Sequence, residues 1–371
     1  MKKVVINSSD LKNNIEILKK LLEEKSKKND IHNSKIIAVV KANGMGLDLV
    51  QFSHFLIENG INDLAVATFE EAKELIQNDV SCNLIMLSPI NDENELKYLI
   101  ENNVILTIGS KENLKRAENI CDKLDKDISA HIKIDIGLGR YGFIYNDFEK
   151  IKYVYDNSKR VKLSGIYSHM VNSIVKEEAI KQFERFNNVL SFLKDNNYDV
   201  GVRHIAASRP FILYDDMVLD AVRLGTILTG RSPFKVEGLK KIGKYETTIS
   251  EIRNIPKGHT ISYGGEFIAP KDMKVAVIST GYMDGFSIEK DRSVYDMRNN
   301  ILCVLKSIKN VFKKNKYKAI INDKEYNVIG RIGMFHSIID IENDNVNIDD
   351  KVVLNNIEIV HVNANIRREY I

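Results

Sequence analysis

Short runs of β-branched and other apolar residues alternate with longer amphipathic stretches through about residue 230 of the chain. Between the runs, segments such as FEEAKELIQ and EEAIKQFERFNNVLSFLKD place apolar residues every three or four positions, as a helix facing a core does. This alternation predicts parallel strands with crossover helices, and eight strands favour an α/β fold of the (β/α)8 TIM-barrel type over an open sheet. The predicted strands are IIAVV (36–40), LAVAT (64–68), LIMLS (84–88), VILTI (104–108), AHIKID (130–135), LSGIYSH (163–169), RHIAAS (203–208) and the segment around AVRLGTI (221–227).

The pattern changes past about residue 235, where short strands and turns follow one another, as in YETTISEIRNIPKGHTISYGGEFIA. We therefore predict a barrel domain over 8–235 and a carboxy-terminal β-rich domain over 236–371, with residues 1–7 as a candidate part of the second domain. One interruption near 292–316 keeps helical spacing, and an inserted surface helix is favoured there over an interaction module. Its apolar positions are Met297, Ile301, Leu305, Ile308 and Phe312.

Charge and cysteine content narrow the chemistry. The 54 basic and 51 acidic side chains nearly cancel, and no dense Lys/Arg run is interleaved with aromatics, so nucleic acid and anionic membranes are poor partners. The amino-terminal lysines precede no apolar signal region, and no stretch reaches the roughly 18 apolar residues of a membrane helix. We expect a cytoplasmic protein that acts on small molecules. Cys82, Cys121 and Cys303 lack metal-ligand spacing, so neither zinc nor disulfides are expected.

Polar residues stand at the carboxyl ends of several predicted strands, the edge at which barrels of this type build their active sites. These residues are Lys41, Arg140, His169 and Ser208. In VVKANGMGLDLV (39–50) the lysine ends an apolar run, where its charge is costly unless it is paired or the amine becomes neutral. A neutral amine is a nucleophile that forms Schiff bases, and pyridoxal phosphate is the commonest biological aldehyde for it. A lysine whose stem packs at the barrel rim is the alternative.

Seven segments in register resemble the alanine racemase family of pyridoxal-phosphate enzymes. They are VVKAN (39–43), HIKIDIGLGRYGF (131–143), SHM (168–170), DAVRLG (220–225), ISYG (261–264), GYMDG (281–285) and GRIGM (330–334). The resemblance implies a barrel that carries pyridoxal 5′-phosphate, a carboxy-terminal β domain, and a homodimer in which each active site borrows residues from the β domain of the partner subunit. It implies an isomerase that racemises an amino acid, with alanine as the default substrate and D-alanine for the cell wall as the product.

Inverting a stereocentre at Cα requires two acid–base groups, one on each face of the planar intermediate. By the resemblance, Lys41 holds the cofactor and serves one face, while Tyr263 serves the other. A tyrosine with the ordinary pKa of about 10 needs cationic neighbours to act as a base, and His169, Arg140 and Arg223 are the candidates. Taken alone, Tyr263 would also fit an ordinary turn aromatic.

The resemblance implies further roles. Arg223 faces the pyridine nitrogen and, because a guanidinium keeps its proton, leaves that nitrogen largely unprotonated. His169 orients Arg223, and Arg140 binds the substrate carboxylate. Lys133 matches a lysine that is often carbamylated, with an unmodified lysine as the alternative. The implied cofactor-binding positions are Lys41, His169, Ser208, Arg223, Gly225 and Thr226, and the implied substrate-binding positions are Arg140 and Met334.

Several positions depart from the family pattern and alter the walls of the expected site. The run GMGL (44–47) replaces a tyrosine that reaches the phosphate, and Ala364 stands where a second tyrosine is usual. Ala207 replaces an asparagine, and Phe335 replaces an aspartate at the substrate entrance. These losses predict weaker cofactor binding unless other groups compensate, or a changed specificity, so serine, ornithine and lysine stay open behind alanine. A non-catalytic pyridoxal-phosphate-binding protein is the alternative of a different class; a decarboxylase is disfavoured because Cys303 lies outside the family motifs.

Overall fold

The computed structural model describes residues 1–265, 267–288, 297–311, 317–342, 344–355 and 357–371. Packing divides the chain into two units, one of Ser9–Ile242 and the other of Met1–Ser8 together with Gly243–Ile371. The sequence analysis placed the division between residues 235 and 236. Within the described residues, no helix is both long and apolar enough to cross a lipid bilayer.

Parallel strands close into a barrel in the unit Ser9–Ile242. Two ladders run β10-β2-β3-β4 and β5-β6-β8-β9, and the single parallel bridges Ile85–Ile105 and Ala207–Arg223 join them at both edges. The predicted barrel is confirmed, but its last two strands end earlier than predicted, so residues 205–207 and 225–227 lie outside the strands and Ser208 begins a helix. The barrel strands are β2 (Lys35–Val39), β3 (Asp63–Val66), β4 (Asn83–Met86), β5 (Leu106–Ile108), β6 (Ile128–Asp135), β8 (Val161–Tyr167), β9 (Val202–His204) and β10 (Ala221–Leu224), and the short β7 (Phe143–Ile144) pairs with β6.

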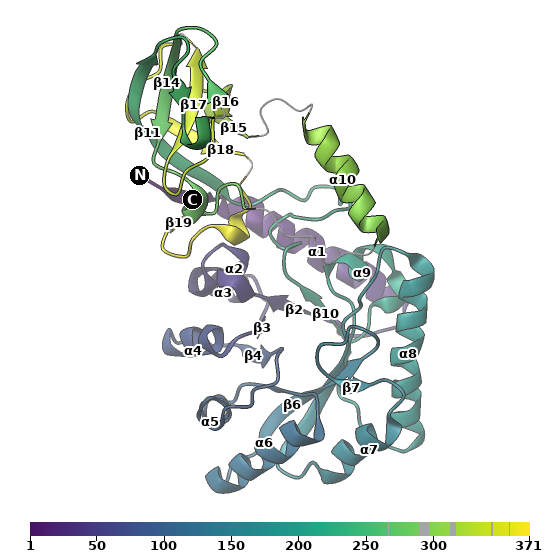
Figure 1. The fold of residues 1–371 in the computed structure, drawn as a ribbon. Coiled ribbons are helices and arrows are strands. Elements are labelled where there is room, and N and C mark those ends of the chain that lie inside the picture. The colour runs from purple at the N-terminus through teal and green to yellow at the C-terminus, as the bar shows by residue number, and fades with distance from the viewer. Residues whose placement is uncertain (266, 289–296, 312–316, 343, 356) are drawn as a thin grey trace. The chain divides into compact units, whose positions relative to one another are not determined.

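Helices between the strands pack outside the barrel (Figure 1). Each turns a narrow apolar face inward, as in α4, which buries Ala72 and Leu75, and in α6, which buries Leu114 and Ile120. The helices are α1 (Ser8–Lys28), α2 (Lys41–Met45), α3 (Leu49–Glu58), α4 (Phe69–Gln77), α5 (Glu93–Glu101), α6 (Lys111–Leu124), α7 (Phe148–Asn157), α8 (Lys176–Asp195), α9 (Ser208–Leu213) and the 3-10 turn η1 (Asp215–Met217).

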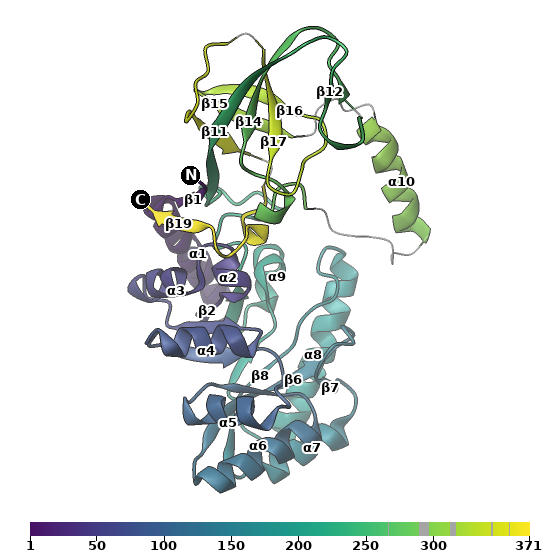
Figure 2. The ribbon, with the colours of Figure 1, turned by 60° about the vertical axis from the view of Figure 1, so that its left-hand side comes forward.

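Mainly antiparallel strands form the second unit (Figure 2), and one pair of strands at its edge is parallel. The long strand β11 pairs with β1 and β18 through its first half and with β14 through its second half. Because β14 continues through β17, β16 and β15 back to β18, these strands close on themselves, while β1 and β19 extend the sheet. The strands are β1 (Lys3–Ile6), β11 (Lys244–Ile255), β14 (Met273–Ile278), β15 (Lys318–Ile321), β16 (Lys324–Ile329), β17 (Ser337–Glu342), β18 (Lys351–Leu354) and β19 (Arg367–Tyr370), with the small hairpin β12 (Thr260–Ile261) and β13 (Phe267–Ile268) and the 3-10 turns η2 (Tyr263–Gly265), η3 (Tyr282–Asp284) and η4 (Ile359–His361).

A helix is inserted between β14 and β15, as the sequence predicts. Helix α10 spans Met297–Val311, whereas the flanking parts of the predicted range 292–316, Phe312 included, lie outside the described residues. The apolar side chains of α10 are more than half exposed in the single chain. They include Met297, Ile301, Leu305 and Ile308.

The chain makes an unusual turn directly after β2, where the motif KANG begins. Ala42, Asn43 and Gly44 have φ values of 56°, 52° and 62°, the left-handed region that residues other than glycine rarely adopt. The Glu71 carboxylate steadies this turn, because it accepts hydrogen bonds from the amides of Ala42 (2.7 Å), Ala67 (2.9 Å) and Thr68 (3.2 Å). One acidic residue at the start of α4 therefore supports the loop that presents Lys41.

Replacing Glu71 tests this support. Glu71→Ala leaves the three amides without their acceptor and should lower the free energy of unfolding by about 1–2 kcal/mol, as measured by urea denaturation. Glu70→Ala, one residue earlier in the same helical turn, removes an exposed carboxylate and should cost less than about 0.5 kcal/mol. Equal losses in the two variants would contradict the role of Glu71.

Candidate active site

The predicted polar residues of the barrel gather in the loops that follow its strands. β2 ends at Val39, and the exposed Lys41 begins α2. The exposed Arg140 lies in the loop after β6, and the half-buried His169 follows β8. Ser208 begins α9, four residues beyond the end of β9. These loops share the carboxyl end of the barrel, the edge at which such folds bind substrates.

Arg223 lies at the centre of this end, inside the barrel. The residue as a whole is 4% exposed. Its Nη1 donates to Nδ1 of His204 at 2.7 Å and to the His204 carbonyl at 2.9 Å. Its Nη2 donates to the Ser168 carbonyl at 2.5 Å and to the Ile205 carbonyl at 3.3 Å, and it lies 3.5 Å from Nδ1 of His169. Burial lowers the pKa of Arg223 to about 10, and the charge of Arg140 adds to the effect. The guanidinium is held by acceptors that carry no charge.

The contact between Arg223 and His204 determines where the protons of two histidines lie. A guanidinium can only donate, so Nδ1 of His204 accepts and the proton of that ring sits on Nε2. Nε2 of His204 lies 2.9 Å from Nδ1 of His131, which must then accept in turn. Both rings are therefore neutral, in line with the lowered pKa of His131, about 4, which burial causes first and the charges of Lys35 and Arg223 reinforce.

Packing around His131 supports this arrangement. Gly165 lies opposite His131 in the register of β6 and β8. A side-chain carbon added at Gly165 would lie 2.6 Å from the imidazole, so the glycine leaves the room that the ring occupies. The His204 ring stacks in parallel on Tyr167 at 4.9 Å between centroids. Sequence analysis missed His131 and His204, although a polar residue at every second position of HIKID indicated an inward polar face of β6.

Lys133 shares that inward face and is 3% exposed. Burial, and after it the charges of Arg223, Arg140 and Lys41, lower its pKa to about 7, while the Asp135 carboxylate acts in the opposite direction. Its Nζ lies 4.7 Å from the centroid of the Tyr167 ring, and within the described part of the chain no carboxylate forms an ion pair with it. Lys133 lies near the carboxyl end of β6, the end of the barrel at which Lys41 and Arg140 follow β2 and β6.

His169 is the fourth member of this group. Burial lowers its pKa to about 3, and the charges of Arg223, Lys133, Arg140 and Lys41 contribute in that order. Its ring is thus neutral beside Arg223, which is the neighbour that the sequence analysis assigned to it.

A cavity of about 290 Å³ opens beside the predicted phosphate positions. Ser208 and Thr226 line it, as does Ala207, and the Ser208 hydroxyl lies 3.5 Å from the Gly225 amide. A side-chain carbon at Gly225 would lie 2.8 Å from the methyl group of Met45, so a larger residue there would displace the end of the Met45 side chain. The structure thus brings Ser208, Gly225 and Thr226 together, with the apolar Met45 against them.

Tyr263 and Met334 belong to the other unit, where they lie in neighbouring turns. Tyr263 is 74% exposed, and a side-chain carbon added at Gly333 would lie 3.9 Å from its ring. The amides of Tyr282 and Met283 donate to the carbonyls of Gly333 (3.0 Å) and Met334 (3.1 Å). Met334 and Phe335 are each about half exposed. The pairing of Tyr263 with Lys41 across the two units stays a prediction.

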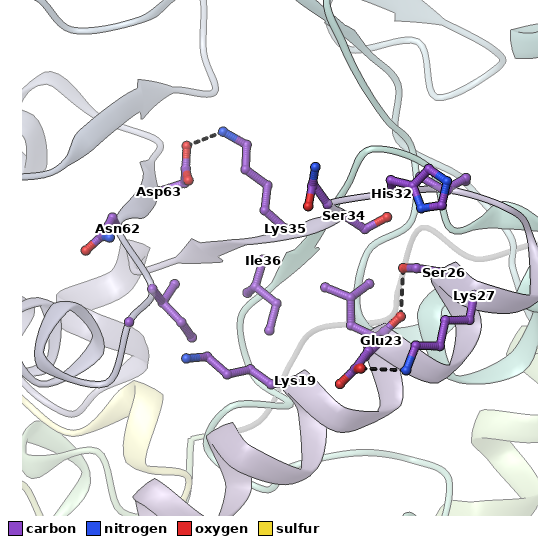
Figure 3. A pocket seen from close by; sticks show the side chains of 15 residues that line it. Lys19, Glu23, Ser26, Lys27, His32, Ser34, Lys35, Ile36, Asn62 and Asp63 are labelled. Carbon is purple, nitrogen blue, oxygen red and sulfur yellow. Dashed lines mark hydrogen bonds and ion pairs between the residues drawn. The ribbon is translucent and has the colours of Figure 1, made fainter.

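Another cavity, of about 510 Å³, opens at the amino ends of β2 and β3 (Figure 3). Lys35 pairs there with Asp63 at 2.6 Å, and Lys27 pairs with Glu23 at 2.7 Å. These charges neutralise each other, and Lys35 begins the strand that Lys41 follows. This cavity therefore lies at the opposite edge from the candidate active site.

The closed barrel, the cationic groups at its carboxyl end and the appended β unit define a two-domain barrel enzyme. The family described as the alanine racemase N-terminal domain matches residues 6–233, and the alanine racemase C-terminal domain matches residues 242–367. The chain belongs to the alanine racemase family.

Individual relatives agree with this assignment. The alanine racemase of Clostridium tetani is 33% identical over 340 residues, which cover 88% of this chain and 81% of that protein. The structure of alanine racemase from Clostridium difficile 630 has a TM-score of 0.84 at 24% identity and covers 100% of this chain and 95% of its own. The structure of alanine racemase from Bartonella henselae with covalently bound pyridoxal phosphate has a TM-score of 0.79 at 22% identity. It covers 100% of this chain and 99% of its own. These two structures share the fold.

The neutral histidines predict a specific loss of stability in acid. The pKa values of His131 (about 4) and His169 (about 3) lie below the ~6.5 of an unfolded chain, so the unfolded state binds more protons between those values. The contribution of these histidines to the free energy of unfolding is fully present above about pH 6.5. It decreases as the pH falls toward 4, by about 1.4 kcal/mol per pH unit for each such histidine. The free energy of unfolding of His131→Asn, measured by urea denaturation between pH 6 and 4.5, should change with pH less steeply than that of the wild type, by about that amount.

A core truncation provides the control for this measurement. Val161→Ala, in the adjacent strand β8, destabilises the same region without removing a titrating group, and it should retain the wild-type slope. A wild-type slope in His131→Asn as well would contradict the neutral state of His131.

Proposed function

We propose that the protein is a pyridoxal-phosphate-dependent racemase that interconverts L- and D-alanine. The observation that carries the proposal is the group of cations at the carboxyl end of the barrel. Lys41, Arg140 and Arg223 lie there, and the described contacts join none of them to a carboxylate. Such a site suits a ligand with a phosphate and a carboxylate, and a cofactor-bound amino acid carries both.

The residues present fit pyridoxal phosphate. The Nη hydrogens of Arg223 are used by His204, Ser168 and Ile205, and in the described residues Nε–H makes no hydrogen bond. This donor can therefore serve an aromatic ring nitrogen. Ser208, whose hydroxyl lies 3.5 Å from the Gly225 amide, and Thr226 line a cavity in which a phosphate has room. When bound, the cofactor would acidify the Cα hydrogen of an amino acid attached to it.

Two residues would move the proton. Lys41 would remove or return it on one face of Cα, and Tyr263 would do so on the other. The exposed position of Tyr263 in its own unit supports this role, because a proton carrier must reach a substrate. Arg140 would bind the substrate carboxylate, for which its guanidinium offers two parallel donors. The neutral acceptors around Arg223 would keep its orientation fixed, with His169 as one of them.

Lys133 would carry a carbamate in this proposal. An amine with a pKa of about 7 is substantially neutral at physiological pH and can react with carbon dioxide. The modified side chain would place a negative charge among Arg223, Arg140 and Lys41. An unmodified lysine over the Tyr167 ring is the alternative.

The proposed assembly is a homodimer that acts in the cytoplasm. Exposed apolar and aromatic residues surround Tyr263 on its unit, and such a patch is typical of a surface that another subunit covers. They include Tyr282, Met283, Met334 and Phe335. A partner subunit could thus contribute Tyr263 and Met334 to the barrel of this chain.

Lys41 tests the cofactor and the reaction together. Wild-type protein should absorb in the band of the lysine-bound cofactor and should wash deuterium from D2O into Cα of alanine, detected by proton NMR. Lys41→Ala should lose the band and lower the exchange rate by roughly a thousandfold or more. Lys35→Ala, at the other end of the same strand, should retain both.

The same exchange measured with serine, ornithine and lysine identifies the substrate. Alanine should exchange fastest, since the proposal keeps it as the default. Cofactor binding without exchange from any of these amino acids would instead support a non-catalytic pyridoxal-phosphate-binding protein.

Mixed dimers test whether the site is shared between subunits. Lys41→Ala and Tyr263→Phe chains should each be inactive as racemases, since each lacks one proton carrier. If the barrel of one subunit uses Tyr263 of its partner, co-expression of the two variants restores one intact site in each hybrid dimer. Racemase activity should then recover to roughly a quarter of the wild-type level, because about half of randomly assembled dimers are hybrids. No recovery in purified hybrids would contradict the shared site.

A further inference from the structure

The cavity beside Ser208 is built from three loops of the barrel unit. These loops follow β8, β9 and β10, and they contribute His169, Ser208 and Thr226 to its lining. Four further hydroxyl-bearing or basic residues line it: Ser173, Arg209, Arg231 and Ser232. None of the lining residues is acidic. Hydroxyl groups and guanidiniums without a carboxylate are the donor set that phosphate monoesters prefer.

Arg209 differs from Arg231, the other arginine of the lining, which donates from Nη1 to the Thr229 carbonyl at 3.3 Å. The Nε of Arg209 is buried and has no hydrogen-bond partner, and no ion pair engages its guanidinium within the described residues. Arg203, nearby in the chain, by contrast makes a bidentate pair with Asp220 at 2.7 Å through both Nε and Nη2. A buried donor without a partner costs about 1–3 kcal/mol, and more when the group is charged. Such a cost is tolerable where a ligand supplies the acceptor.

The surroundings of Gly225, next to Thr226 in the chain, explain why an additional donor is useful. Met45 brings its methyl group against Gly225, and a thioether donates no hydrogen bond. At Gly225 the predicted phosphate position therefore meets an apolar side chain. The Ser208 hydroxyl and the amides near Gly225 are neutral donors, so a guanidinium would supply the charge that balances a phosphate dianion.

We infer that Arg209 is a further cofactor-binding residue, whose guanidinium donates charge-assisted hydrogen bonds to the phosphate of pyridoxal phosphate. The inference rests on the proposed function. Arginine suits this position better than lysine, because a planar guanidinium can donate to two phosphate oxygens at once.

Titration of the cofactor-free protein tests the inference. For Arg209→Gln, the Kd of pyridoxal phosphate should rise about tenfold to a hundredfold, the loss of hydrogen bonds to a charged group. The Kd of pyridoxal, which lacks the phosphate, should change less than about twofold. Inorganic phosphate, followed by phosphorus NMR, should bind more weakly to the variant by a similar factor. An unchanged ratio of the two Kd values would overturn the inference.

Matched variants guard against indirect effects. Arg116→Gln makes the same charge change at an exposed arginine of α6 and should leave both Kd values at the wild-type level. Arg209→Lys keeps the charge without the planar fork and should give an intermediate Kd for pyridoxal phosphate. If circular dichroism shows that Arg209→Gln is unfolded, the lysine variant decides, and a wild-type ratio there overturns the inference.

The outcome is distinct from failure of the proposed function. Wild-type protein that binds inorganic phosphate through Arg209 but never shows the lysine-bound cofactor band would refute the racemase and would leave an anion site of another kind. Cofactor binding that is unchanged in Arg209→Gln would refute this inference and would leave the proposed racemase function standing. If the wild-type protein binds neither phosphate nor pyridoxal phosphate, both are overturned.

Discussion

Arg223 closes the barrel with its main chain and organises the site with its side chain. Between β9 and β10 the ladder is reduced to the bridge Ala207–Arg223, where the Arg223 amide donates to the Ala206 carbonyl at 2.9 Å. A buried charge costs several kcal/mol unless acceptors surround it. The acceptors are main-chain carbonyls of Ser168, His204 and Ile205. The carbonyls of Ser168 and Ile205, just beyond β8 and β9, accept hydrogen bonds from the guanidinium instead of from a neighbouring strand. The candidate site therefore forms where the ladder is interrupted.

Acceptors without charge leave the site positive, and this has consequences for binding. Repulsion among cations adds to burial in lowering the pKa of Lys133 to about 7 and that of Arg223 to about 10. A carboxylate beside them would relieve the repulsion permanently and would weaken the attraction for an anionic ligand. A phosphate monoester, with a charge of about −1.5 to −2, would relieve it only when bound. The proposed cofactor should therefore stabilise the folded barrel, because it binds the native state.

The sequence predicted the fold and part of the site, and each success or failure has a physical origin. β-branched runs located every barrel strand, but RHIAAS reached beyond β9, because hydrophobicity cannot tell a strand from a loop whose carbonyls face a buried cation. Lys41 stood out because it ends an apolar run. His131 and His204 did not, since each is an ordinary polar residue until their mutual contact at 2.9 Å is seen. Arg209 carried no sequence signal of burial either. The roles of Tyr263 and Met334 came from family resemblance alone.

The two units hold their candidate residues in position by different means. In the barrel, strands and their ladders hold Arg223, Lys133 and His131, so these positions tolerate little change. Tyr263 instead lies in a turn, between Ser262 in the left-handed region (φ 69°) and Gly264. A side-chain carbon at Gly330 would lie 2.9 Å from the Ser262 side chain, so the GRIGM segment packs directly against this turn. Changes at Met334 or Phe335 can reshape that surface without moving a cation of the barrel. Selection for a new substrate should therefore act first on these turns, where Phe335 already replaces the usual aspartate.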